Sequence, residues 1–367
     1  MSGAKPGAGS AVNSGAQSGA SARTGPGPGV GVIGLGFMGR THLAAWQRAA
    51  DEGHPCRLVA GCDRDPSLLD ARPADAAALP PFELAFDPAR MRACREVPEL
   101  LADPAVELVS ITTPTDSHVE LTLAALEAGK HVLVEKPVAL ASADIARLAD
   151  AARGSGRLVM PALCIRFWPG WSWLRQTVAS GELGALRSLS LRRLAPRPRW
   201  NDAFYGDPAR SGGALIDLHL HDSDLVRWCL GEPDEVTTLG DDDHVSTLYR
   251  YADAASPTHV LAEGGWDLAA GRSFRMCYEA VFEGGSAEYR SGREHPLHLW
   301  RGAAVAVPVP LPDLSGYDVQ CRALLAALAA GASHPPVTLG EAFATARLLE
   351  AEQQSLRSGR PVELARD

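Results

Sequence analysis

Residues 217–224 read DLHLHDSD, which places two histidines and three aspartates within eight positions. Side chains of these types bind metals or move protons, and the secondary structure decides which. In a strand, where side chains alternate between faces, Asp217, His219 and His221 would share one face and suit a metal. In a helix, residues advance by about 100° each, so Asp217, His221 and Asp224 would share a face and His219 would point away.

The residues around this segment favour a helix. The apolar run continues through Leu230, which is too long for an ordinary strand, and the following GEP is typical of a helix stop. We therefore predict a helix that begins after Gly212–Gly213 and holds no metal. The spacing of Asp217 and His221 also suits an exposed pair that merely stabilises a helix, and this alternative stays open.

A second set of residues suited to chemistry lies in VGVIGLGFMG, residues 30–39. The segment reads as a strand, a G-x-G-x-x-G turn and the start of a helix. Gly34 permits the tight turn, Gly36 lets backbone approach a pyrophosphate, and Gly39 lets the helix pack on the strand. The helix N-terminus would offer unpaired N–H groups to the phosphates. The pattern predicts a dinucleotide site, although any glycine-rich turn can show the same spacing.

Polar residues also follow three further predicted strands. A strand over 58–62 ends at Asp63, at the distance of roughly 20 residues at which a Rossmann fold binds the adenosine ribose. Two more strands end at Thr112–Pro114 and at Glu135–Lys136, with a helix over 119–128 between them. Because the carboxyl ends of parallel strands form one edge of a sheet, where ligands bind, these residues are expected to line a nucleotide cleft.

Taken together, these motifs resemble the Gfo/Idh/MocA oxidoreductases. The resemblance is carried by GVIGLGFMG, TPTDSH, VEKP, SGGALIDLHLHDSDLVRW and SGRPVEL, and it covers nearly everything after residue 29. It implies an α/β Rossmann domain followed by an α+β domain with a large open, mostly antiparallel sheet. It also implies that a C-terminal helix packs back on the Rossmann domain.

We accordingly expect four parts along the chain. They are a disordered tail over 1–28, a dinucleotide-binding Rossmann domain over 29–163, a substrate and oligomerisation domain over 164–335, and a C-terminal helix over 336–367. The tail is rich in Gly, Ala and Ser and cannot bury enough apolar surface to fold. In the second domain a helix is expected over 171–180. The alternating runs SLSLRRL, STLYRYAD, THVLAEGGW and RMCYEAVFEG predict antiparallel strands.

The resemblance implies that Lys136, Asp217 and His221 are catalytic. Oxidation of a secondary alcohol needs a hydride acceptor, a base for the hydroxyl proton and positive charge at the developing alkoxide. Imidazole titrates near neutrality, so His221 suits the base, while Lys136 suits the charge. A solvated strand-end lysine is the alternative for Lys136. Asp217 would orient the substrate hydroxyl or the imidazole.

Contacts to the cofactor are expected from the glycine turn and from the ends of the later strands. The residues concerned are Gly34, Gly36, Phe37, Met38, Gly39, Asp63, Arg64, Thr113, Pro114, His118, Glu135 and Lys136. Because a carboxylate at Asp63 accepts hydrogen bonds from ribose hydroxyls and repels a 2′-phosphate, NAD(H) is the expected cofactor. Arg64 would offset that repulsion, which leaves NADP(H) open.

Substrate contacts are expected from Arg166, Trp200 and His219. Arg166 lies near the domain junction, where an interdomain salt bridge is equally consistent with the sequence. Trp200 belongs to a proline-rich segment, 194–213, and long loops of this kind are often functional. Most members of the resembled family carry glycine at the position of His219, so this histidine is expected either to add a substrate contact or to have no role.

Composition narrows the partners. The net charge of -9 argues against a nucleic acid or an anionic membrane surface as the main partner. The seven cysteines lack any CxxC, which fits a reducing compartment. The longest apolar helical run, 323–332, is too short to cross a membrane. We therefore expect a cytoplasmic protein. A homodimer or homotetramer formed through the C-terminal sheet is a separate expectation.

The leading hypothesis is an NAD(P)-dependent dehydrogenase or reductase acting on a secondary alcohol of a sugar, an inositol or a sugar derivative. Two alternatives stay open. Some members of the resembled family oxidise a sugar, eliminate its glycosidic group and reduce it again with tightly bound NAD, which gives net glycoside cleavage. A non-catalytic nucleotide-binding regulatory protein is the other alternative, although it would need none of Lys136, Asp217 and His221.

Overall fold

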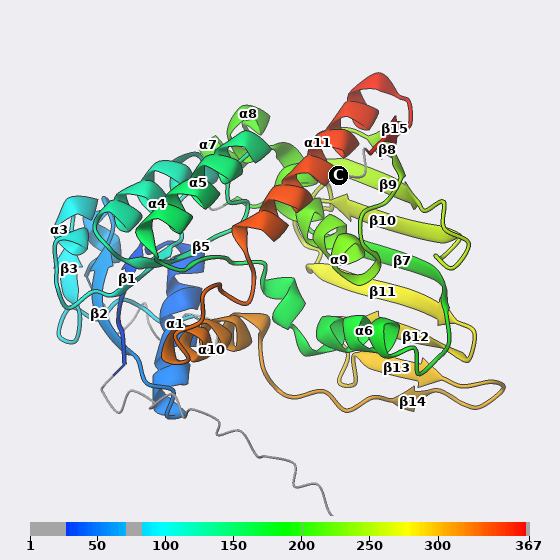
Figure 1. Cartoon of the computed structure of the whole chain (residues 1–367), viewed down its shortest axis with the longest axis horizontal. Coiled ribbons are helices and arrows are strands. Elements are labelled where there is room, and N and C mark those ends of the chain that lie inside the picture. Colours follow the sequence, from blue (N-terminus) through cyan, green and yellow to red (C-terminus); the bar gives the residue numbers. More distant parts are fainter. Residues whose placement is uncertain (1–26, 71–82, 200, 365–367) are drawn as a thin grey trace, which may run out of the picture.

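The computed structural model describes residues 27–70, 83–199 and 201–364 of the 367-residue chain. The expected tail over 1–28 lies almost entirely outside these residues. Two β-sheets stand at opposite ends of the molecule, with helices between them (Figure 1). This arrangement confirms the predicted fold class, a Rossmann domain followed by a domain built on a large, mostly antiparallel sheet.

The first sheet has six parallel strands in the order β3-β2-β1-β4-β5-β6. Every residue of β1 and β4 is buried, as is typical of parallel strands covered by helices on both faces. The chain order reverses between β1 and β4, and a sheet of this kind forms its ligand crevice at that point. The strands are β1 (Gly29–Ile33), β2 (Arg57–Cys62), β3 (Arg92–Cys94), β4 (Leu108–Ile111), β5 (His131–Val134) and β6 (Val159–Pro161).

The helices of this domain bury one apolar face each. α1 begins directly after the glycine turn and buries Leu43, Trp46 and Ala49 at helical spacing. The helix predicted over 119–128 is α4, which begins one residue earlier. The helices are α1 (Phe37–Asp51), α3 (Val97–Leu101), α4 (His118–Glu127) and α5 (Ser142–Ser155), with short turns η1 (Pro66–Leu68) and η2 (Thr115–Ser117).

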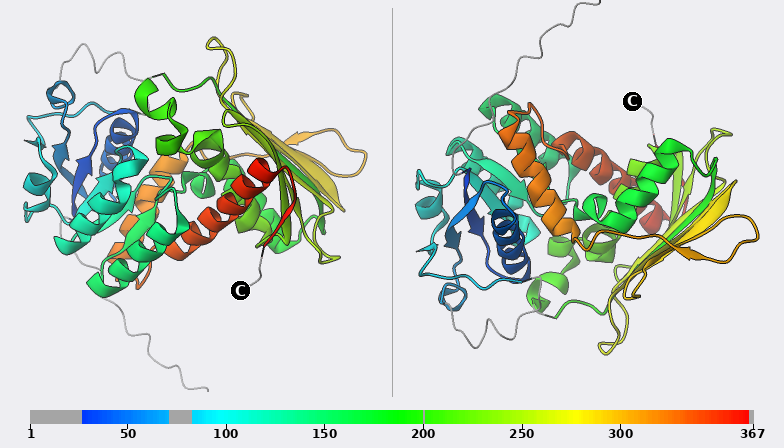
Figure 2. Two further views of the ribbon diagram at one scale, coloured as in Figure 1. Left: turned by 90° about the horizontal axis from the view of Figure 1, so that it is seen from above. Right: turned by 90° about the horizontal axis from the view of Figure 1, so that it is seen from below.

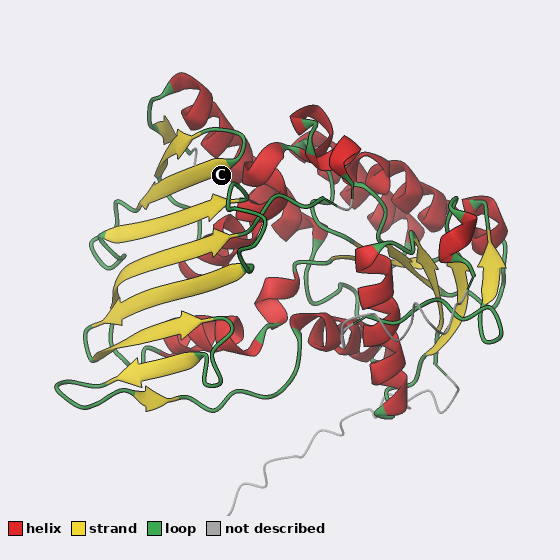
Figure 3. Cartoon of the chain, turned by 180° about the vertical axis from the view of Figure 1, so that it is seen from behind, coloured by secondary structure: helices red, strands yellow, loops and turns green. Residues whose placement is uncertain are grey.

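The second sheet has nine strands in the order β14-β13-β12-β11-β7-β10-β9-β8-β15. β7 and β10 are parallel neighbours, whereas the other neighbouring pairs of described strands are antiparallel. The predicted alternating runs are β7, β9, β10 and β11. Figure 3 shows that helices leave one face of this sheet bare. The strands are β7 (Leu186–Leu194), β8 (Glu235–Gly240), β9 (His244–Arg250), β10 (His259–Gly265), β11 (Arg275–Phe282), β12 (Gly285–Arg290), β13 (Leu297–Trp300), β14 (Val307–Pro308) and β15 (Val362–Glu363).

The other face of the second sheet is covered by helices that lie between the two sheets (Figure 2). No helix of the described part of the chain is long and apolar enough to cross a membrane. The helical elements of this region are η3 (Cys164–Phe167), α6 (Pro169–Ser180), α7 (Asp202–Tyr205), α8 (Pro208–Ser211), η4 (Leu215–His219), α9 (Leu220–Leu230), α10 (Gly316–Ala329) and α11 (Leu339–Ser358).

The segment that carries Asp217 and His221 is helical, as predicted. It begins after Gly212 and Gly213, whose φ angles are +77° and +67°. The sequence did not predict that its first turn, η4, is a π-helix. The wider turn changes the angular spacing between η4 and α9. Asp217, His221 and Asp224, which were expected on one face, therefore do not all point the same way. Asp217 contacts Lys136, whereas Asp224 points to Arg166.

Helix α11 joins the two halves of the molecule. Its Leu339 and Ala346 belong to the apolar core beside the first sheet, whereas Leu348 belongs to the core of the second sheet. β15 follows α11 and pairs with β8 at the edge of the second sheet. The two domains therefore share a helix that is part of both cores.

Candidate active site

A cleft of about 600 Å³ opens at the carboxyl edge of the first sheet. Its walls are the residues that follow β1, β2, β4 and β5, together with the 201–217 part of the second domain. Most of the predicted cofactor contacts line it, namely Gly34, Gly36, Phe37, Met38, Asp63, Arg64, Thr113, Pro114, Glu135 and Lys136. Gly39 and His118 lie behind this wall.

The glycine turn has the shape of a phosphate cradle. A Cβ at Gly39 would lie 1.9 Å from the Gly34 carbonyl oxygen, so glycine at this position lets α1 pack against the turn. At Gly36, by contrast, no atom of the described chain beyond its immediate neighbours lies within 4 Å of the Cβ position. α1 starts here without a side-chain cap from the described residues. Since the free N–H groups of a helix N-terminus bind phosphate, these residues fit a pyrophosphate.

Asp63 follows β2 and is held firmly at the cleft wall. Its Oδ2 accepts a hydrogen bond from the Leu35 N–H at 2.7 Å, and its Oδ1 accepts one from the Asp65 N–H at 2.9 Å. Each oxygen keeps a lone pair for a hydroxyl donor. Arg64 and Arg95 also line the cleft. The sequence analysis missed Arg95, because β3 before it is only three residues long and RAC carries no strand pattern.

His118 is buried, so the prediction that it contacts the cofactor directly is wrong. Its ring nitrogens lie 2.8 Å from the Thr113 carbonyl oxygen and 2.7 Å from the Pro137 carbonyl oxygen. Burial lowers the pKa of the ring. The histidine ties the turn after β4 to the turn after β5, where the Lys136–Pro137 peptide is cis. It therefore supports the cleft wall from behind.

Lys136 and Asp217 meet across the junction of the two domains. The Lys136 Nζ lies 3.0 Å from Asp217 Oδ1 and donates to the Asp217 carbonyl oxygen at 2.6 Å. Burial acts to lower the pKa of Lys136, but Asp217, then Tyr205 and Glu135, outweigh it, and the pKa lies above its ordinary value of 10.5. The lysine side chain is only 17 % exposed, so the solvated-lysine alternative does not hold. A fixed ammonium borders the cleft.

His221 lies one turn beyond Asp217 and is half-buried. Its Nδ1 is buried and has no hydrogen-bond partner within the described residues. Burial, and then the charges of Lys136 and Arg193, hold the pKa of His221 well below its ordinary value of 6.5. The ring is therefore neutral at physiological pH. The structure thus brings Lys136, Asp217 and His221 together, with the partly exposed His221 one helical turn from Asp217, which lines the cleft.

Arg193 on β7 is a neighbour of this group that the sequence analysis missed. Its Nε and Nη2 form a bidentate pair with Asp222, with both distances 2.9 Å. The guanidinium also lies over the Trp171 ring, 5.4 Å from its centroid. The pair is fully buried, and its cation contributes to the low pKa of His221. Only tertiary packing brings SLSLRRL beside Asp222, so the sequence gives no signal for it.

His219 is fully buried, which corrects the predicted substrate contact. Its Nε2 lies 3.2 Å from Thr247 Oγ1 and 3.4 Å from Glu352 Oε2. The ring also packs on Gly264, where a Cβ would come within 2.8 Å of Nδ1. The π turn directs this side chain into the second sheet, away from the cleft. His219 therefore anchors η4 to the sheet and to α11.

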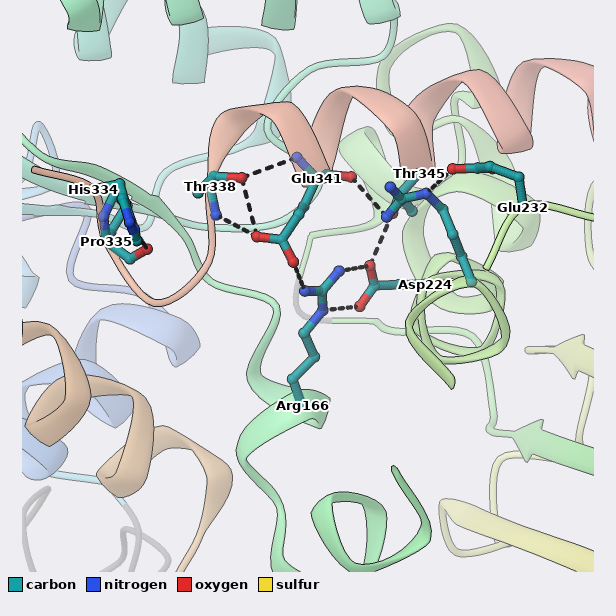
Figure 4. Close-up of polar contacts among 9 residues, drawn as sticks. Arg166, Asp224, Glu232, His334, Pro335, Thr338, Glu341 and Thr345 are labelled. Atoms are coloured by element: carbon teal, nitrogen blue, oxygen red, sulfur yellow. Dashed lines mark hydrogen bonds and ion pairs between the residues drawn. The ribbon is translucent and has the colours of Figure 1, made fainter. Parts of the chain in front are cut away.

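Arg166 belongs to a buried ion-pair cluster rather than to the cleft (Figure 4). Its Nε and Nη2 donate to Asp224 at 2.8 and 2.7 Å, and its Nη1 pairs with Glu341. Asp224 also accepts the Thr345 hydroxyl at 2.8 Å. These residues come from η3, α9 and α11, so Arg166 forms a buried salt bridge within the second domain and a second one to the C-terminal helix. The prediction that Arg166 contacts the substrate is therefore wrong.

Substituting Arg166→Met is expected to lower the free energy of unfolding by about 3–5 kcal/mol, because it leaves Asp224 buried without its cation. Denaturant unfolding measures the change. Arg147→Met is the matched control, since the Arg147–Glu120 pair is exposed and is expected to contribute about 1 kcal/mol or less. A small effect of Arg166→Met on stability, combined with a raised KM for substrate, would favour the substrate contact instead.

Helices α7 and α8 form the second-domain wall of the cleft. The residues that line it there are Asn201, Phe204, Tyr205 and Arg210. Tyr205 packs edge-on against Trp266, with ring centroids 5.8 Å apart. Arg210 bonds Asp116 on the first-domain side at 2.8 Å. Trp200, which was predicted to contact substrate, lies outside the described residues.

Two family models match the chain. Residues 29–163 match the oxidoreductase family with an NAD-binding Rossmann fold, and residues 171–288 match the GFO/IDH/MocA C-terminal domain. The two matches follow each other in the same order as the two sheets.

Individual proteins agree with these matches. An uncharacterised oxidoreductase of Rhizobium meliloti, ORF334, is 30 % identical over 321 residues, which is 80 % of this chain and 92 % of that protein. The inositol 2-dehydrogenase of Pseudomonas fluorescens is 26 % identical over 298 residues, 80 % of this chain and 70 % of that protein. A levoglucosan dehydrogenase solved with NADH and levoglucosan shares the fold, with a TM-score of 0.77 at 21 % identity over 92 % of this chain and all of that one. The chain therefore belongs to the Gfo/Idh/MocA family of NAD-binding oxidoreductases.

Proposed function

We propose that the protein is an NAD(H)-dependent dehydrogenase or reductase that acts on a secondary alcohol of a sugar, an inositol or a related polyol. The observation that carries the proposal is the Lys136–Asp217 ion pair in the wall of a cleft that also holds the glycine turn. The inositol 2-dehydrogenase and the levoglucosan dehydrogenase named above support the polyol class of substrate.

The cleft residues fit each part of the cofactor. The glycine turn and the start of α1 would hold the pyrophosphate, and Asp63 would hold the adenosine ribose. The nicotinamide would then lie toward Glu135 and Lys136. When bound, the nicotinamide ring supplies the acceptor or donor of the hydride.

The three polar residues at this end have different duties. As the substrate hydroxyl loses its proton, negative charge develops on its oxygen, and the Lys136 ammonium stabilises that charge. The neutral imidazole of His221 receives the proton at a ring nitrogen. Asp217 holds the lysine ammonium in place through the ion pair between Nζ and Oδ1. In the direction of reduction the same residues act in reverse.

A screen of sugars, inositols and sugar derivatives with NAD⁺ and NADP⁺ tests the proposal. Reduction of the cofactor is followed by absorbance, and Lys136→Met serves as the inactive control. Turnover of at least one polyol that is lost in this variant supports the proposal. Cleavage of a glycoside without net change of the cofactor would favour the oxidation–elimination alternative. A chain that binds NADH and turns over none of these compounds would contradict a catalytic role on polyols.

The preference between NAD(H) and NADP(H) is expected to depend on Asp63. We expect NAD(H) to bind more tightly, because the carboxylate repels a 2′-phosphate, and Asp63→Ser to narrow or invert the preference. The preference is measured by the dissociation constants of NADH and NADPH. Arg95→Ser is the control, because it removes a positive charge from the same part of the cleft. Equal or tighter binding of NADP(H) by the unmodified chain would show that Arg64 and Arg95 outweigh the carboxylate.

We also propose that the chain forms a homodimer or homotetramer through the bare face of its second sheet (Figure 3). That face carries Leu239 on β8 and Leu248 on β9, which are 62 % and 44 % exposed. Exposed apolar side chains on an uncovered sheet favour association. Light scattering on the purified protein measures the mass, and a monomer at micromolar concentration would contradict this proposal.

A further inference from the structure

His42 is a fully buried histidine on α1 that none of the roles above uses. Its Nε2 lies 2.9 Å from Glu135 Oε1, and its Nδ1 lies 3.1 Å from Ser110 Oγ. Ser110 Oγ in turn accepts the Trp46 Nε1–H at 3.0 Å. These four side chains form a polar row through the core of the first domain. The row ends at Glu135, which lines the cleft directly beside Lys136.

The hydrogen bonds of this row assign its protons. The Trp46 indole is a donor only, so the Ser110 oxygen accepts from it and the Ser110 hydrogen is free to bond Nδ1. Because a carboxylate only accepts, His42 Nε2 carries the hydrogen that is donated to Glu135, and Nδ1 can accept the Ser110 hydrogen. The second carboxylate oxygen of Glu135 accepts the Lys136 backbone N–H at 3.1 Å. In this arrangement each of these polar hydrogens has an acceptor.

The consequence is a carboxylate with a fixed orientation. Glu135 is only 5 % exposed, and both of its oxygens are bound. Without the donor on His42, the glutamate side chain would regain other rotamers. The charge of Glu135 acts on the Lys136 ammonium, so the freed carboxylate would compete with Asp217 for that ammonium.

We propose that His42 is a positioning residue for the nicotinamide half of the cofactor, and that it acts by holding Glu135 in the orientation seen here. The inference rests on the function proposed above, since it requires the nicotinamide to lie at the Glu135–Lys136 end of the cleft. α1 then serves both halves of the cofactor. Its first turn faces the phosphates, and its second turn controls the far end of the cleft through His42.

Two amide substitutions at His42 distinguish the contributions of its two ring nitrogens. The side-chain nitrogen of glutamine lies near the position of the histidine Nε2, whereas the side-chain oxygen of asparagine can take the position of Nδ1. His42→Gln therefore keeps a donor for Glu135, and His42→Asn keeps only the contact with Ser110. Both replacements are neutral and polar, so each variant is the matched control for the other.

The test compares the binding of NADH with that of ADP-ribose, which lacks the nicotinamide, to the full chain by titration calorimetry. His42→Asn is expected to weaken NADH binding about 10-fold or more, the usual effect of losing a hydrogen bond to a charged group. ADP-ribose binding is expected to stay within about twofold, because its partners are the glycine turn and Asp63. His42→Gln is expected to recover most of the NADH affinity.

Two results would overturn the inference. Parallel weakening of NADH and ADP-ribose would mean that His42 only supports α1, and equal defects in the two amide variants would mean that the donor to Glu135 is irrelevant. If His42→Asn does not fold, His42→Phe fills the ring space without either nitrogen and carries the same comparison. Failure of the proposed function has a different signature, in which the two ligands respond as expected but no polyol is turned over.

Discussion

Lys136→Met is expected to lower turnover on a confirmed substrate by on the order of 10²–10³-fold, the usual effect of removing a group that stabilises an oxyanion. NADH binding is expected to survive, because the cofactor rests mainly on the glycine turn and Asp63. Steady-state kinetics and calorimetry measure the two effects. Lys130→Met is the matched control, since this buried lysine donates to the carbonyl oxygens of Asp103 and Val106 and lies outside the cleft.

The pH dependence of turnover extends this test. The pKa of Lys136 lies above its ordinary value of 10.5, so the ammonium stays charged up to at least that pH. Deprotonation of Lys136 is therefore expected to cause no loss of activity between pH 7 and pH 10.5. Its charge also helps to depress the pKa of His221. Lys136→Met should therefore move the acidic limb of the residual activity to higher pH. An acidic limb that stays in place would contradict the coupling between the two residues.

His221→Ala is expected to slow turnover by on the order of 10²–10⁴-fold, the usual contribution of a positioned acid–base group. The imidazole must be neutral to accept a proton, and its pKa lies well below 6.5. The wild-type rate should therefore fall only as the pH drops below that value. The alanine variant should lose this acidic limb altogether, and a pH–rate profile measures it.

Other outcomes would reassign these roles. If the limb persists in His221→Ala and disappears in Lys136→Met, the lysine is the base. If neither substitution slows turnover, the active site lies elsewhere. NADH affinity is the control for His221→Ala, because this residue is proposed to contact the substrate and is not among the proposed cofactor contacts.

Local patterns in the sequence were sufficient for the first domain. The glycine spacing fixes a turn and the start of a helix, and a run of buried apolar residues followed by Asp63 fixes a strand end. Such features depend on neighbours along the chain. The same is true of the alternating strands of the second domain, in which every second residue is buried. The fold class follows from these patterns.

The site was less predictable, because its details depend on residues that are distant in the sequence. The π turn of η4 accompanies the packing of His219 on Gly264, which belongs to β10. Arg166 was consistent with two roles until folding placed Asp224 and Glu341 beside it. The lining helices α7 and α8 have only four residues each, which is too short for a periodic pattern.

The shared helix α11 has a consequence for how the chain folds. Its Glu350 accepts hydrogen bonds from Ser142 on α5, 208 residues earlier in the chain. Because α11 packs against α5, the part of the α5 surface that it covers stays exposed on a nascent first domain until α11 has been synthesised. Contacts between residues so far apart in the sequence slow folding. Intermediates that still expose apolar surface are prone to aggregation. The first domain is thus expected to complete its folding only after α11 has packed against it, rather than on its own on the ribosome.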